Sequence, residues 1–182
     1  MKLTSNEFKN NEVMPKVHAY LYGNKSPSLV ISDIPSKTQT VAIIVDDPDA
    51  KNVPKKMGGQ GKVWTHWTMW NIVPFGADLP EHPFTIPGDF HDKRSRLMFN
   101  DVTEGITSFG GIGYGGPAPP DKEHTYRFIV FALNCKLDLN QKATKDDLIK
   151  AMKGHILGRE ILLGRFEDPE RQKKRLDKEA KK

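Results

Sequence analysis

Residues 41–50, with the sequence VAIIVDDPDA, carry the strongest structural signal in the chain. The first five residues are apolar and mostly β-branched, which is typical of a central strand covered on both faces. Asp46 and Asp47 end this run, and Pro48 favours an extended backbone at Asp47, which restricts where the Asp47 carboxylate can point. Taken alone, Asp47, Pro48 and Asp49 also fit a simple turn, since Asp and Pro are common in turns for local reasons.

Further strands are expected on both sides of this one. Residues 63–72, VWTHWTMWNI, are rich in aromatics, and residues 126–133, YRFIVFAL, are almost continuously apolar. Residues 17–22 and 28–34 are shorter candidates. Period-2 alternation in the aromatic stretch predicts two faces. One face carries Trp64, His66, Thr68, Trp70 and Ile72, and the other carries Val63, Thr65, Trp67 and Met69.

The pattern changes after Asn140. Thr144 and Asp147 form an acidic capping box that predicts a helix, and residues 155–163 suggest a second short helix. Many strands followed by helices predict a mainly β sandwich with one or two C-terminal helices. Residues 75–96 and 102–123 are expected to be long irregular loops, which are usually functional or tightly packed.

Length and charge exclude several classes of protein. The 182 residues suit a single domain, expected at 1–166, followed by a charged helical tail at 167–182 that frays in solvent. The net charge is +5, and the tail contributes +2 of it, so a nucleic-acid partner is not expected. No apolar run approaches the roughly 20 residues that an integral membrane helix needs. The start of the chain has no apolar signal segment and Cys135 is the single cysteine, so we expect a cytoplasmic protein without disulfides.

Two histidines are candidates for chemistry. His66 lies between Trp64 and Trp70 on its predicted face, where it is either a buried structural histidine or part of an aromatic-walled pocket. His124 shares a predicted strand face with Tyr126, directly after the glycine-rich and proline-rich residues 110–120, GGIGYGGPAPP. This segment is no phosphate-binding P-loop, because it lacks the Gly-Lys-Ser/Thr ending and no helix is expected after it. Its glycine spacing also matches the dinucleotide fingerprint, but this match is spurious, because no helix or βαβ unit is expected after it.

These residues together resemble a known family. Asp47-Pro48-Asp49-Ala50, then Trp64-Thr65-His66-Trp67, then the segment from Tyr114 to Pro120 with His124 and Tyr126, are similar to the phosphatidylethanolamine-binding proteins. These are also called Raf-kinase-inhibitor-like proteins, and the prokaryotic branch is most similar. The resemblance covers most of the chain. The family's Gly-x-His-Arg motif is replaced here by Lys122-Glu123-His124-Thr125.

The resemblance implies an antiparallel β-sandwich with a small pocket for phosphate, acetate or a phospholipid head group. It places the following residues at that pocket: Asp47, Asp49, Trp64, His66, Pro119, Pro120, His124 and Tyr126. Two imidazoles can bind an anion through N–H groups, so we expect tighter binding near pH 6 than near pH 8. Neither a metal nor a cofactor is expected.

The family resemblance also implies a modulator of a protein partner, as a monomer or a homodimer. The alternative is an inhibitor of a serine protease or a kinase that acts through its surface loops. A hydrolase or a zinc-dependent enzyme that uses the His and Asp residues is a weaker alternative, since two His and a carboxylate can bind zinc. No Ser or Cys lies in a recognisable nucleophile setting, because Ser108 lacks an elbow and Cys135 follows the end of a strand. We therefore expect a binding protein and not an enzyme.

Overall fold

The computed structural model describes residues 1–74, 83–90, 99 and 101–180. Within these residues the strands are β1 (Lys2–Thr4), β2 (Glu12–Val13), β3 (Leu29–Ser32), β4 (Thr40–Asp47), β5 (Trp64–Ile72), β6 (Phe84–Ile86), β7 (Thr103–Glu104), β8 (His124–Leu133) and β9 (Ile156–Phe166). The helices are the short 3-10 helices η1 (Lys16–His18), η2 (Asp49–Asn52) and η3 (Lys55–Met57), and the α-helices α2 (Lys145–Met152) and α3 (Pro169–Glu179). No helix among these residues is long and apolar enough to cross a membrane.

Two sheets pack against each other. The larger has the strand order β2-β9-β8-β4-β5-β7, and the smaller has the order β1-β3-β6. All neighbouring strands run antiparallel except β2 and β9, which are parallel. The main core lies between the sheets and contains fully buried side chains of both, such as Ile31 of β3, Ile43 of β4 and Phe128 of β8. The predicted mainly β fold is confirmed.

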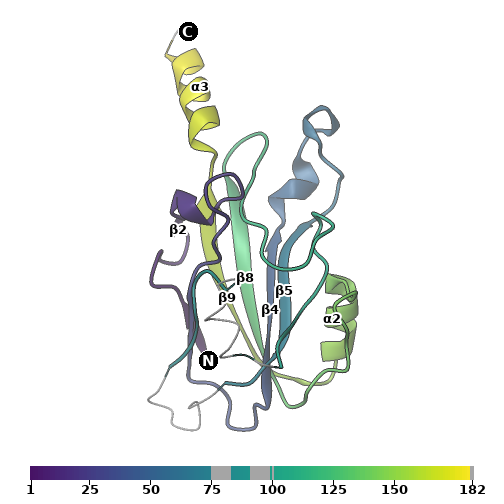
Figure 1. Ribbon diagram of the computed structural model, residues 1–182. Helices are drawn as coiled ribbons and strands as arrows, with labels where there is room; N and C mark the ends of the chain where they lie inside the picture. Colours follow the sequence, from purple (N-terminus) through teal and green to yellow (C-terminus); the bar gives the residue numbers. More distant parts are fainter. Residues whose placement is uncertain (75–82, 91–98, 100, 181–182) are drawn as a thin grey trace.

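Helix α2 lies beside the large sheet (Figure 1). A second apolar cluster lies between α2 and the outer face of that sheet. Ala42 and Ile44 of β4 contact this cluster, while Val41, Ile43 and Val45 contact the main core. The central strand is therefore covered on both faces, as its apolar run predicts. The predicted capping box is also present, since the Thr144 hydroxyl accepts the Asp147 N–H and the Asp147 carboxylate accepts the Thr144 N–H.

Two irregularities in β5 change which side chains share a face. The register of β5 against β4 shifts once between the pairs Val45–Trp67 and Asp46–Thr65, and again between Ile43–Met69 and Val41–Ile72. Each shift inserts one extra residue into β5, and such a bulge moves the following side chains to the other face. Trp67 and Met69 consequently pack in the same core as Ile72, while Trp70 packs in the cluster under α2. The predicted strict alternation over residues 63–72 is therefore wrong.

Two predicted elements have a different structure. Residues 156–163 of the segment 155–163, expected to be helical, lie in strand β9, which pairs with β8 from Leu133 to His124. The large sheet would otherwise end at the apolar strand β8, and pairing with β8 outweighs the local preference of a segment that Gly158 already makes a poor helix. Residues 17–22, expected to form a strand, form η1 and turns, in which successive local hydrogen bonds replace pairing with another strand.

The expected loops are only partly irregular. Residues 84–86 form β6 and residues 103–104 form β7, while residues 75–82 and 91–96 lie outside the described part of the chain. Helix α3 projects from the body beyond the end of β9 (Figure 1). Asp168 caps it, because its carboxylate accepts the N–H groups of Glu170 and Arg171, and Pro169 is its first residue.

Candidate functional site

One end of the large sheet carries a cavity of about 140 Å³. Strand β4 ends there, and its antiparallel neighbours β5 and β8 begin there, so Asp47 pairs with Trp64 on one side while Asp46 pairs with Arg127 on the other. This topology brings together residues that are far apart in the chain. Six of the predicted site residues line the cavity: Asp47, Trp64, His66, Pro120, His124 and Tyr126.

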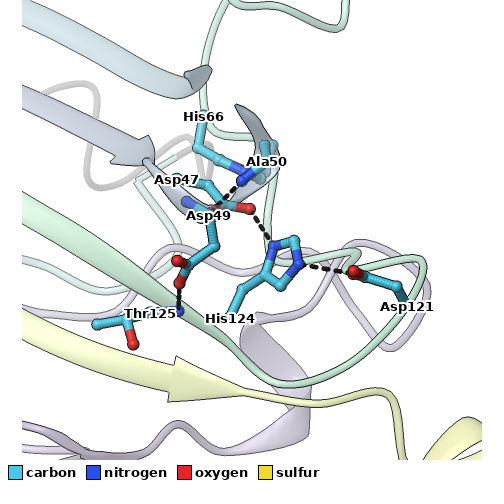
Figure 2. Close-up of polar contacts among 8 residues, drawn as sticks. Asp47, Asp49, Ala50, His66, Asp121, His124 and Thr125 are labelled. Atoms are coloured by element: carbon cyan, nitrogen blue, oxygen red, sulfur yellow. Dashed lines mark hydrogen bonds and ion pairs between the residues drawn. The ribbon is translucent and has the colours of Figure 1, made fainter. Parts of the chain in front are cut away.

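Each ring nitrogen of His124 contacts a carboxylate (Figure 2). Nδ1 lies 2.6 Å from Oδ2 of Asp47, and Nε2 lies 2.8 Å from Oδ1 of Asp121. Ionised carboxylates only accept hydrogen bonds, so both ring nitrogens can donate only when the ring is a protonated imidazolium. Burial alone would lower the pKa of His124, but the hydrogen bonds and charges of Asp47 and Asp121 outweigh burial and raise it. The two contacts therefore favour the protonated imidazolium of His124 over its neutral ring.

The Asp47 carboxylate is fixed by the turn that follows it. Its Oδ1 accepts the backbone N–H groups of Asp49 and Ala50, at 2.9 and 3.2 Å (Figure 2). Asp47-Pro48-Asp49 is therefore both a turn and part of the cavity wall. The turn orients one oxygen of the Asp47 carboxylate, and the other oxygen accepts a hydrogen bond from His124. Asp49 points elsewhere and accepts the backbone N–H of Thr125, which ties the turn to the start of β8.

His66 has the opposite electrostatic character. Its Nδ1 lies 2.5 Å from the carbonyl oxygen of Gly115, and the Gly115 N–H donates back to the His66 carbonyl. Burial lowers the pKa of His66, and the Gly115 carbonyl offsets this only in part. The ring is therefore neutral near pH 7, with its proton on Nδ1 and a lone pair on Nε2.

The Tyr126 ring lies between the two histidines. Its centroid is 5.1 Å from that of His66 and 6.4 Å from that of His124. The side chain is 1% exposed, and its O–H has no acceptor in the described part of the chain, although the backbone N–H of Ala118 lies close to the hydroxyl oxygen. Burial raises the pKa of this hydroxyl well above its usual value, and the negative charge of Asp47 adds to the effect. The hydroxyl is a protonated donor at neutral pH, and a buried polar group without a partner is costly.

Two of the predicted residues do not line the cavity. Asp49 binds Thr125, as described above, and Pro119 is buried behind the wall to which Pro120 contributes. Sequence reasoning also missed several lining residues: Ala50, Val53, Gly58, Gly59, Gln60, Phe109 and Ala118. Phe109 is an aromatic residue directly before the glycine-rich segment, and its ring packs edge-on against both Trp64 and His66. Asp121 was also missed, although a carboxylate three residues before a candidate histidine is close enough in the chain to contact it.

The candidate nucleophiles lie outside the cavity. The Ser108 hydroxyl accepts the backbone N–H of Thr65, so it is a structural group, and Cys135 also lies outside the lining. Among the described residues, the lining contains no Ser, Thr, Cys or Lys. No group of three or more His, Cys, Asp or Glu in the same part of the chain is arranged to hold a metal ion.

Comparisons with known proteins give a consistent result. Residues 4–167 match the family model described as "Phosphatidylethanolamine-binding protein". A UPF0098 protein of Chlamydia muridarum is 36% identical over 167 residues, which cover 92% of this chain and 99% of the relative. A UPF0098 protein of Methanothermobacter thermautotrophicus is 35% identical and covers 91% and 98%.

Two solved structures share the fold. One is a putative phosphatidylethanolamine-binding protein homologue from Chlamydia trachomatis, with a TM-score of 0.75, 31% identity and coverage of 91% of this chain and 96% of that one. The other is YbcL of E. coli, described as a new member of the mammalian PEBP family. Its TM-score is also 0.75, with 27% identity and coverage of 92% and 98%.

Proposed function

Because the chain belongs to the phosphatidylethanolamine-binding protein family, we propose that its cavity binds a small oxyanion such as phosphate, acetate or the phosphate of a phospholipid head group. The observation that carries this proposal is the Tyr126 hydroxyl, whose O–H is buried at the cavity wall without an acceptor in the described part of the chain. A ligand oxygen that accepts this O–H would remove the cost of leaving it unpaired. The aromatic rings of Trp64 and Phe109 exclude water from the same space and strengthen the bond.

The rim of the cavity favours an anion as well. Residues 50–62 contain four lysines and no Asp or Glu, and they contribute five of the cavity-lining residues. The four lysines, Lys51, Lys55, Lys56 and Lys62, are all exposed. Positive side chains around a cleft raise the local concentration of anions. The attraction of an anion by these lysines offsets its repulsion by the buried Asp47–His124–Asp121 group, whose net charge is −1 when His124 is protonated.

The cavity is proposed to be a binding site and not a catalytic one. An enzyme reading would need a nucleophile beside a general base. Nε2 of His66 could accept a proton, but the described lining offers no Ser, Thr, Cys or Lys for it to activate. His124 cannot act as a base while both ring nitrogens donate to carboxylates.

We also propose that ligand binding modulates the association with a protein partner. Phe109 lines the cavity and stacks on the exposed Tyr20 at a centroid distance of 4.9 Å, so a ligand would contact a residue that also forms part of the outer surface. The alternative proposal is that the protein inhibits a serine protease or a kinase through its surface loops. A pull-down with and without 10-fold excess phosphate over its Kd, alongside a protease assay, separates the two.

The proposal is tested with Tyr126→Phe, which removes only the hydroxyl. We expect phosphate affinity, measured by calorimetry, to fall about tenfold, because one buried hydrogen bond to a charged ligand is lost. The melting temperature should stay unchanged or rise slightly, since the O–H has no acceptor in the described part of the chain. Tyr22→Phe is the matched control, because the Tyr22 hydroxyl binds Asp168 and not the cavity. Wild-type protein that binds neither phosphate nor a phospholipid in native mass spectrometry would refute the proposal.

A further inference from the structure

The two carboxylates that hold His124 are not equivalent. Asp47 has a side chain that is 4% exposed, and two backbone N–H groups fix its other oxygen. The Asp121 side chain is 17% exposed, and its only hydrogen bond in the described part of the chain is the one to Nε2 of His124. Asp47 is therefore part of the folded frame, whereas Asp121 is a loop carboxylate held by a single contact.

We propose that Asp121 is an internal anion that occupies the second N–H donor of His124 and thereby limits which external anions the cavity accepts. This inference rests on the proposed function, because it concerns the affinity of the same cavity for oxyanions. Asp121 is not itself a lining residue, but it directly follows the lining residue Pro120, and its carboxylate contacts Nε2 of the lining residue His124. An oxyanion that uses Nε2–H of His124 must first displace this carboxylate.

The competition favours the internal carboxylate. Asp121 lies three residues from His124, and a tethered group competes at a high effective concentration. Its charge also adds a repulsive term, since the Asp47–His124 pair alone is neutral and the group of three carries one net negative charge. The wild-type cavity should therefore bind anions weakly, through Tyr126 and without the imidazolium. A dianion that can outcompete the carboxylate should be preferred over a monoanion.

The loop that carries Asp121 is held in place by contacts that do not involve the cavity. The Arg171 guanidinium in α3 donates to the carbonyl of Pro120, and Arg165 of β9 forms an ion pair with Glu123 at 2.9 Å. The positions of residues 120–123 are thus set independently of any ligand. Replacing the Asp121 side chain should leave this backbone in place and expose Nε2–H.

Calorimetry with inorganic phosphate at pH 7 and constant ionic strength tests the inference on the full chain. We expect Asp121→Ala to bind phosphate at least about tenfold more tightly than the wild type, since one charge-assisted donor becomes available. Asp121→Asn, which keeps the shape but loses the charge, should lie between them and serves as the second variant if the alanine variant folds poorly. Asp101→Ala is the matched control, because it removes the same charge from an exposed ion pair with Lys136.

The outcomes separate this inference from the proposed function. Equal affinities of wild type and Asp121→Ala, or weaker binding by the variant, would overturn the role of Asp121 and leave anion binding intact. Absence of phosphate binding in wild type and in both Asp121 variants would overturn the inference and count against the proposed function as well. An equal gain in Asp101→Ala would show that net charge is responsible, which also overturns the inference.

Discussion

Asp46 and Asp47 are neighbours in the chain with different partners, because successive residues of a strand point to opposite faces. Asp46 faces α2 and binds Arg127 through two hydrogen bonds of 2.7 and 2.8 Å, with Lys145 at 3.2 Å. Asp47 faces the cavity and binds His124. The first carboxylate therefore joins the sheet to the helix, and the second one builds the site.

His66 should give anion binding a defined pH dependence. Burial lowers the pKa of His66, so it is neutral near pH 7, and a bound anion would favour its protonated form. We therefore expect tighter binding near pH 6 than near pH 8. Sulfate is the appropriate probe, because its own charge does not change over this range. A calorimetric affinity for sulfate that is constant from pH 6 to pH 8 would contradict the prediction.

His124 should make the stability of the folded protein depend on pH above about pH 6.5. Its pKa is raised, so the folded state holds the proton more tightly than the unfolded state does. This contribution is fully present below the unfolded value of about 6.5 and is lost as the pH rises through the folded value. In His124→Gln, the loss of melting temperature between pH 6 and pH 9 should be smaller than in the wild type. Parallel curves for the two proteins would show that His124 is not held as an imidazolium.

At the scale of elements, the loop at residues 110–120 owes its position to close backbone packing. The Gly116 N–H donates to the Asn24 side chain, and the Tyr20 N–H donates to the carbonyl of Pro117. A Cβ atom at Gly116 would lie 2.0 Å from the carbonyl oxygen of His18. This short distance explains why residue 116 is a glycine. The loop that supplies Ala118 and Pro120 to the cavity packs directly on the backbone of residues 18–20.

Gly116→Ala should consequently displace this loop. We expect a loss of about 1–3 kcal/mol in the free energy of unfolding, because the clash is with backbone that cannot move aside, and weaker phosphate binding follows. Denaturant unfolding and calorimetry measure the two effects. Gly111→Ala is the control, since nothing lies within 4 Å of a Cβ atom at that position. The packing argument fails if the two variants are equally stable.

At the scale of the whole molecule, the division into a domain of residues 1–166 and a tail of residues 167–182 remains a prediction. Among the described side chains, Asp168 at the N-cap of α3 accepts a hydrogen bond from Tyr22, and Arg171 of α3 donates to the Pro120 carbonyl. Leu176, its only leucine, is 51% exposed. The helix therefore buries little apolar surface, and packing, not propensity, supplies most helix stability.

Truncation after Glu167 should therefore leave the fold intact. We expect the melting temperature to change by at most about 4 °C, equivalent to roughly 1 kcal/mol in a protein of this size. Circular dichroism should report the loss of helical signal only. A shorter truncation after Glu179, which keeps α3, is the control. A fall of about 10 °C or more in the longer truncation alone would show that residues 168–179 belong to the domain.

Local sequence patterns were sufficient for several parts of the molecule. The apolar run in β4, the continuous apolar character of β8 and the capping residues of α2 and α3 each depend on neighbours in the chain, and all agree with the structure. The site residues were found by a different route. The spacing of Asp47, His66 and His124 matched a family pattern, and antiparallel pairing of β5 and β8 with β4 then placed them around one cavity.

The sequence by itself determined the strand-rich class and the buried central strand, because these depend on composition and short-range periodicity. Only the tertiary structure decided that residues 156–166 form a strand, that a bulge places Ile72 on the same face as Trp67 and Met69, and that Asp121 contacts His124. Each of these depends on a partner that is distant in the chain or on a loop conformation. Pairing energy with such partners outweighs local preference, and no local pattern records it.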